Sequence, residues 1–86
     1  MAASKSYRAL GERVVRLLRE ERERRGLSKY ALEQTSGVSQ QMIGYVERGL
    51  RNPSLETALR MADGLEVDLG QIIAKARLAA TRAKAK

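Results

Sequence analysis

Residues 27–49, LSKYALEQTSGVSQQMIGYVERG, constrain the fold more than any other segment, because they predict two short helices joined by a tight turn. Ser28 and Ser39 each precede a helix-like run, and a serine hydroxyl there can accept a hydrogen bond from an otherwise unpaired backbone N–H. Gly37 lies where the chain must turn within a few residues, and a left-handed conformation is cheap only for glycine. Gly49 marks the end of the second helix. The apolar residues that should pack this pair together are Leu27, Leu32, Val38, Ile43 and Val46.

The remaining sequence extends this pair into an expected five-helix, all-α domain. Apolar residues at helical spacing over residues 10–25, followed by Gly26, predict the first helix. A fourth helix is expected after Ser54 and is closed by Gly64, and a fifth is expected after Asp68, which begins a capping box. The expected buried stripe of the fourth helix contains Leu55, Leu59 and Ala62, with Ala58 as a further candidate.

The length and composition allow one small domain. With 86 residues the chain can bury a single core, which we place at residues 10–74, between a flexible arm at 1–9 and a basic, alanine-rich tail at 75–86. The tail is expected to be either a frayed helical extension or disordered. The absence of Cys and His excludes disulfides, the usual zinc sites and catalysis by Ser-His or Cys-His pairs. We expect no metal, cofactor, small-molecule ligand or membrane partner, and a cytoplasmic location.

The net charge of +7 is unevenly distributed. Residues 26–74 carry four cations and six acids, whereas residues 75–86 carry five cations and no acid. A basic excess favours a polyanionic partner, but basic ends are also common solubility devices, so charge alone leaves both interpretations open.

The outward face of the second short helix is the candidate reading surface. It carries Gln40, Gln41, Gly44, Tyr45 and Arg48 at helical spacing. A glutamine carboxamide can pair with both the N7 acceptor and the N6 donor of adenine in a major groove. The alternative is that the glutamines are simply soluble surface residues and that Tyr45 is partly buried. Gly44 is unfavourable in mid-helix by about 1 kcal/mol, which predicts a close approach by DNA or by a neighbouring helix.

This segment resembles the helix-turn-helix of lambda-repressor-like regulators of the Cro/CI or xenobiotic-response-element type. The resemblance runs from about Gly11 to Ile73 and includes Ser36-Gly37-Val38-Ser39, the paired glutamines and Val46-Glu47-Arg48-Gly49. It implies base contacts by Gln40, Gln41, Gly44 and Tyr45. It also implies phosphate contacts, against the alternative of ordinary solvated polarity, by residues at the helix starts and in the following loop: Ser28, Lys29, Ser39, Arg48, Arg51 and Asn52.

Two further positions are interpreted through the same resemblance. Arg22 and Glu47 match a pair that joins the first helix to the end of the third as a structural salt bridge. Glu33 departs from the family pattern, which usually has a small alanine there, packed against the third helix. The carboxylate is therefore expected to reach solvent or to pair with a cation, with a slight splaying of the two helices.

The expected function is sequence-specific binding of double-stranded DNA by a transcriptional regulator, either a repressor or a controller-type autoregulator. One short helix reads few base pairs, so a homodimer on a palindromic operator is expected, with its seam at Leu69, Ile72 and Ile73. An antitoxin or adaptor that uses the scaffold for protein–protein interaction is the alternative. An enzyme is not expected, because the densest carboxylates, Glu20, Glu21 and Glu23, lie on an Arg-rich helical surface without a pocket signal.

Overall fold

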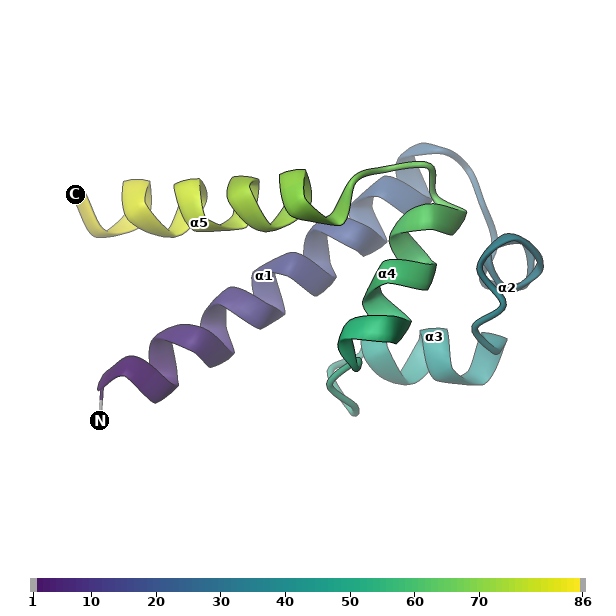
Figure 1. Cartoon of the computed structure of the whole chain (residues 1–86), viewed down its shortest axis with the longest axis horizontal. Coiled ribbons are helices and arrows are strands. Elements are labelled where there is room, and N and C mark those ends of the chain that lie inside the picture. Colours follow the sequence, from purple (N-terminus) through teal and green to yellow (C-terminus); the bar gives the residue numbers. More distant parts are fainter. Residues whose placement is uncertain (1, 86) are drawn as a thin grey trace.

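The fold is built from helices alone within the part of the chain that the computed structural model describes, residues 2–85, with side chains described for residues 7–80. The helices are α1 (Ala2–Arg24), α2 (Lys29–Ser36), α3 (Gln40–Glu47), α4 (Leu55–Gly64) and α5 (Leu69–Ala85) (Figure 1). The expected all-α, five-helix fold class is confirmed.

The two outer helices are longer than expected. α1 begins at Ala2 rather than at Leu10, so the segment predicted as an arm is helical from its second residue. α5 continues to Ala85, so the tail is a helical extension rather than a separate coil. High intrinsic helix propensity explains both, since each segment is rich in Ala, Arg and Lys.

The helices form a compact end and a divergent end. α1 packs against α5 and α3, while α2 packs against α3 and α4. α1 and α5 run away from this cluster and diverge, so both termini lie at the end of the molecule opposite to α2 (Figure 1). None of the described helices combines the length and hydropathy that crossing a membrane requires.

The core lies where the five helices converge. Its fully buried large side chains come from four of the helices and from the turn after α4: Leu18, Leu32, Ile43, Val46, Met61 and Leu65. Each such side chain removed from water contributes roughly 1.5–3 kcal/mol, so this small cluster stabilises the α2–α3 pair against α1 and α4.

The expected buried stripe of α4 was wrong in two positions. Leu55 is 70% exposed and Leu59 is 44% exposed. Ala62 and Ala58 are buried as expected, but Met61 and the C-cap residue Leu65 complete the inward stripe in place of the two leucines. The small alanines let α4 approach its neighbours closely, which the larger leucines at 55 and 59 would prevent.

The end of α4 differs from the other helix ends. Gly26, Gly37 and Gly49 take the left-handed conformation after α1, α2 and α3, with φ of 69°, 75° and 76°. After α4, however, the left-handed residue is Glu66, with φ of 59°. Gly64 ends α4 but has another role. A Cβ built on it would lie 2.9 Å from side-chain atoms of Thr35 and Ser36, so glycine permits the contact between α2 and α4.

Candidate nucleic-acid interface

Two serine caps position the helices that carry the candidate interface. The Ser28 hydroxyl accepts a hydrogen bond from the Ala31 N–H at 3.0 Å, and the Ser39 hydroxyl accepts one from the Met42 N–H at 3.1 Å. Each cap satisfies one of the free N–H groups at a helix start, as the sequence predicted. The two helices therefore begin at defined residues.

A shallow hollow of about 520 Å³ lies on the outer face of α3. It is lined by six residues, all of them predicted from the sequence to contact DNA: Lys29, Gln40, Gln41, Gly44, Tyr45 and Arg48. Lys29 comes from the start of α2 and the others come from α3 or its C-cap. The tertiary structure thus brings one residue of α2 next to the candidate reading surface of α3.

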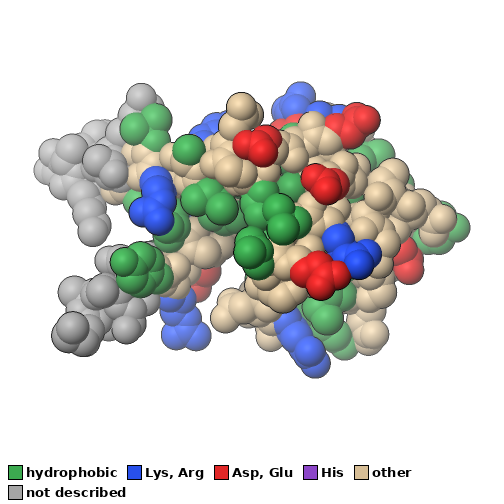
Figure 2. Space-filling view, in the orientation of Figure 1, with side chains coloured by type: hydrophobic (Ala, Val, Ile, Leu, Met, Phe, Trp, Pro, Cys, Tyr) green, Lys and Arg blue, Asp and Glu red, His purple; other side chains and the backbone are tan. Residues whose placement is uncertain are grey.

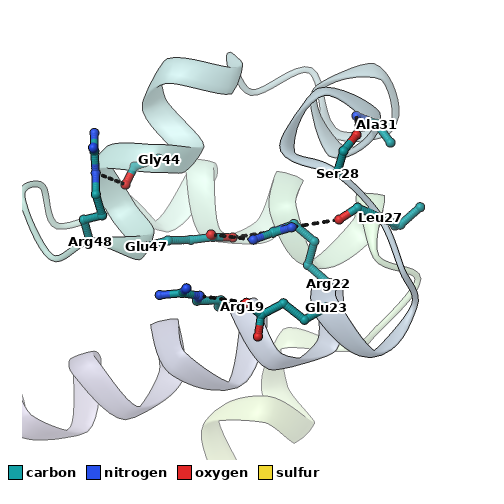
Figure 3. A network of polar contacts seen from close by, with 9 residues as sticks. All are labelled: Arg19, Arg22, Glu23, Leu27, Ser28, Ala31, Gly44, Glu47 and Arg48. Carbon is teal, nitrogen blue, oxygen red and sulfur yellow. Dashed lines mark hydrogen bonds and ion pairs between the residues drawn. The ribbon is translucent and has the colours of Figure 1, made fainter.

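Gly44 forms part of the floor of this hollow. A Cβ built on Gly44 would meet only the Arg48 guanidinium, at 3.7 Å, which is an ordinary contact distance. Arg48 lies over this position because its Nε donates to the Gly44 carbonyl oxygen at 3.2 Å (Figure 3). No neighbouring helix therefore requires glycine here. Of the two explanations that the sequence left open, close approach by a ligand is the one that the packing favours.

Tyr45 organises the polar side chains around the hollow. Its hydroxyl accepts a hydrogen bond from Nε2 of Gln41 at 2.8 Å. The guanidinium carbons of Arg48 and Arg51 lie 5.7 and 5.9 Å from the centre of its ring, within the range of cation–π attraction. Tyr45 is half-buried, so its exposure lies between the predicted outward position and the alternative of partial burial.

A buried ion pair holds α3 in place. Nε and Nη2 of Arg22 donate to Oε2 and Oε1 of Glu47 at 2.7 and 2.9 Å, and Nη1 of Arg22 donates to the Leu27 carbonyl oxygen at 2.7 Å. Figure 3 shows this guanidinium between the end of α3 and the turn before α2. The two side chains are only 10% and 2% exposed. The hydrogen bonds from Arg22 to Glu47 raise the pKa of Arg22, which therefore stays charged.

The ion pairs explain how the candidate interface is basic although residues 26–74 have more acids than cations. Glu47 pairs with Arg22 and Glu66 pairs with Arg25, so two of these acids are matched by cations from outside the segment. The cations of the hollow, Lys29 and Arg48, have no carboxylate among the residues that line it. A low-charge domain thus presents a locally positive surface around two carboxamides.

Two carboxylates of α1, those of Glu21 and Glu23, form ion pairs with neighbouring arginines. Glu21 pairs with Arg24 and Arg25, and hydrogen bonds from these two arginines lower the pKa of the Glu21 carboxyl. Glu23 pairs with Arg19 at 3.1 Å (Figure 3). Among the residues that the structure describes, no cluster of His, Cys, Asp and Glu could hold a metal ion. The acidic face of α1 therefore has the contacts of a solvated helical surface.

The other predicted residues lie outside the hollow. Asn52 is exposed in the loop after α3 and lines a second concave surface, described below. Leu69 and Ile72 belong to the core, with exposures of 6% and 9%. Glu33 is partly exposed on α2, and its carbonyl oxygen accepts a hydrogen bond from the Gly37 N–H at 2.9 Å.

A second concave surface was not predicted from the sequence. A groove of about 970 Å³ lies between α1, α4 and α5, and apolar side chains line much of it: Tyr7, Leu10, Val14, Leu55 and Ile73. Figure 2 shows hydrophobic side chains gathered near the centre of this face. Leu55 was the residue that could have indicated this groove in the sequence, because a leucine at the start of a helix can face either the core or solvent.

Comparison with known proteins agrees with this geometry. The family model described as Helix-turn-helix matches residues 18–72, which include α2, α3 and α4. An HTH-type transcriptional regulator of Haemophilus influenzae is 48% identical over 40 residues, which is 46% of this chain and 41% of that protein. The chain therefore spans less than half the length of that relative. The HTH-type transcriptional regulator y4dJ of Sinorhizobium fredii is 36% identical over 64 residues, or 74% of this chain and 78% of that regulator.

No solved structure matches the chain. The family match covers more than half of the sequence and contains the capped helix pair, the ion pair at its base and the polar hollow on α3. This chain belongs to the Cro/CI-type helix-turn-helix family, whose members include HTH-type transcriptional regulators.

Proposed function

We propose that this protein is a sequence-specific, double-stranded-DNA-binding transcriptional regulator, a repressor or a controller-type autoregulator, that inserts α3 into the major groove. The observation that carries this proposal is the hollow on α3, where two carboxamides lie next to Lys29 and Arg48. Carboxamides discriminate base edges, whereas cations bind phosphates of any sequence. One surface thus combines the two kinds of group that sequence-specific binding requires.

The residues divide between base reading and phosphate binding. Those on the exposed face of α3 would contact base edges: Gln40, Gln41, Gly44 and Tyr45. Those at the helix starts and in the loop after α3 would contact phosphates: Ser28, Lys29, Ser39, Arg48, Arg51 and Asn52. The capping serines keep their hydroxyl protons for this purpose, because each uses its oxygen to accept the backbone N–H.

The proposal includes a homodimer on a palindromic operator. Two copies related by a two-fold axis read half-sites about 34 Å apart, or a multiple of that spacing. The seam that we propose is the groove between α1, α4 and α5, because Ile73 and the 70% exposed Leu55 both line it. Leu69 and Ile72 would support this seam from the core. A species that sediments as a monomer, both free and on a palindromic site, would contradict it.

The test of DNA reading begins with selection of bound fragments from random duplex DNA. Titrations on the selected site and on random duplex then compare variants. Gln40→Ala is expected to lose about 1–3 kcal/mol on the selected site and almost nothing on random duplex, since it removes base readout but no charge. Lys29→Ala is expected to weaken both complexes alike and to lower the salt slope by about one.

Matched controls come from residues away from the hollow. Gln34 is an exposed glutamine of α2, and Arg60 is an exposed cation of α4, so Gln34→Ala removes a carboxamide elsewhere and Arg60→Ala removes a positive charge elsewhere. Equal losses for Gln40→Ala on selected and random DNA would show that the reading surface is misplaced. A wild-type protein without salt-dependent binding to any duplex would favour the role in protein–protein interaction.

A further inference from the structure

The side chain of Gln41 is held by a partner within its own helix. Gln41 and Tyr45 are four residues apart on α3, where side chains of one helix face meet. Nε2 of Gln41 donates to the Tyr45 hydroxyl at 2.8 Å. A free glutamine on a helix surface samples many rotamers, and either end of its carboxamide can face a base. This hydrogen bond selects one of those arrangements before any DNA is present.

The bond leaves the groups that a base edge would need. A carboxamide has two N–H donors and one oxygen, so the bond to Tyr45 still leaves one N–H and the Oε1 acceptor of Gln41. These two remaining groups match the N7 acceptor and the N6 donor of adenine.

The ring of Tyr45 lies within cation–π distance of two arginine side chains. Arg48 at the C-cap of α3 and Arg51 in the following loop lie 5.7 and 5.9 Å from its centre. Arg48 is held again by its bond to the Gly44 carbonyl oxygen. One side chain therefore contacts a candidate base-reading group through its hydroxyl and two candidate phosphate-binding groups through its ring.

We propose that Tyr45 is a positioning residue that couples base reading by Gln41 to phosphate binding by Arg48 and Arg51. Its hydroxyl orients the carboxamide, and its ring holds the guanidinium groups beside the carboxamide. This inference rests on the proposed function and names the residue that sets specificity within the hollow. It predicts that substitutions can separate the effect of the Tyr45 hydroxyl from the effect of its ring.

Two substitutions make this separation. Tyr45→Phe keeps the ring and removes only the hydroxyl, so discrimination at the base pair read by Gln41 is expected to fall about threefold to tenfold, as for one hydrogen bond. Affinity for random duplex and its salt slope are expected to stay unchanged. Tyr45→Leu removes the ring as well, and is expected to weaken binding to all duplexes by roughly a further twofold to fivefold for each arginine released, as for exposed cation–π pairs.

A double-mutant cycle with Gln41→Ala tests the coupling directly. If Tyr45 acts through Gln41, Tyr45→Phe costs no further discrimination once Gln41 is alanine. The same fold-loss in both backgrounds would overturn the inference, as would equal weakening of selected and random duplex by Tyr45→Phe. Circular dichroism of each variant checks that α3 is still folded, which the partial exposure of Tyr45 leads us to expect.

A measurement without DNA separates this inference from the proposed function. In the free protein, ¹⁵N relaxation of the Gln41 side-chain amide is expected to report an ordered group that becomes mobile in Tyr45→Phe, with the Gln40 amide as the internal reference. DNA binding by a wild type whose Gln41 amide is as mobile as that of Gln40 would refute the positioning role alone. Failure of the wild type to bind any duplex, with Gln41 ordered, would instead refute the proposed function and the reading role that depends on it.

Discussion

Replacement of Gly44 by alanine tests whether the hollow on α3 exists for a ligand rather than for the fold. Alanine is more favourable than glycine inside a helix by about 1 kcal/mol, because glycine loses more backbone entropy on folding. A Cβ at position 44 would meet only the Arg48 guanidinium, at 3.7 Å, so no strain offsets this gain. We therefore expect Gly44→Ala to stabilise the protein by about 0.5–1 kcal/mol.

The same methyl group should weaken the DNA complex. It raises the floor of a hollow that is lined by Gln40, Gln41 and Tyr45, and it moves any base edge away from those groups. Loss of one well-formed bidentate base contact costs about 1–3 kcal/mol, so a selected operator should bind at least several-fold more weakly. The variant should thus become more stable and bind less tightly, which a purely structural glycine would not do.

The assay combines unfolding with titration of the selected site. For a domain of this size, a gain of about 0.5–1 kcal/mol should raise the melting temperature by about 2–8 °C. Gly11→Ala is the matched control for the unfolding measurement, because Gly11 is also helical and its added Cβ would meet nothing within 4 Å. Unchanged operator affinity in Gly44→Ala would refute the close approach of DNA to this position. A destabilised variant would refute the packing argument.

The other predictions concern the ion pair, the contact between α2 and α4, and the C-terminal end. Arg22→Ala should destabilise the fold by about 3–5 kcal/mol by leaving a carboxylate 2% exposed and unpaired, and urea unfolding in a cycle with Glu47→Ala should show strong coupling. Gly64→Ala should cost about 1–3 kcal/mol in the same assay, because its Cβ would lie 2.9 Å from α2 side chains. Truncation after Ala80 keeps the buried Ala76 and removes three cations, so it should preserve thermal stability. In DNA titrations that truncation should lower the salt dependence of the binding constant by up to about 0.9 in log–log slope for each phosphate that the protein no longer neutralises. An unchanged slope would show that the C-terminal end does not contact DNA.

Local chemistry explains why the helix starts and turns could be predicted from the sequence. The starts of α2 and α3 could be placed from Ser28 and Ser39, because a cap joins residues only three apart along the chain. The turns at Gly37 and Gly49 could be placed because a positive φ favours glycine wherever it occurs. The ion pair of Arg22 and Glu47 spans 25 residues and was found through family resemblance, not through spacing.

Tertiary packing decided what the sequence left open. α4 carries two overlapping apolar stripes at helical spacing, and only the packing of α2 and α5 against it selects the stripe with Ala58 and Met61 over the stripe with Leu55. Glycine is required at position 64 because α2 side chains lie close to it. The residue with the left-handed conformation after α4 is Glu66 instead. Arg51 lies over Tyr45 because the loop after α3 folds back along the helix. Helical periodicity shows which residues share a face, but the surfaces of the neighbouring helices determine which face is buried.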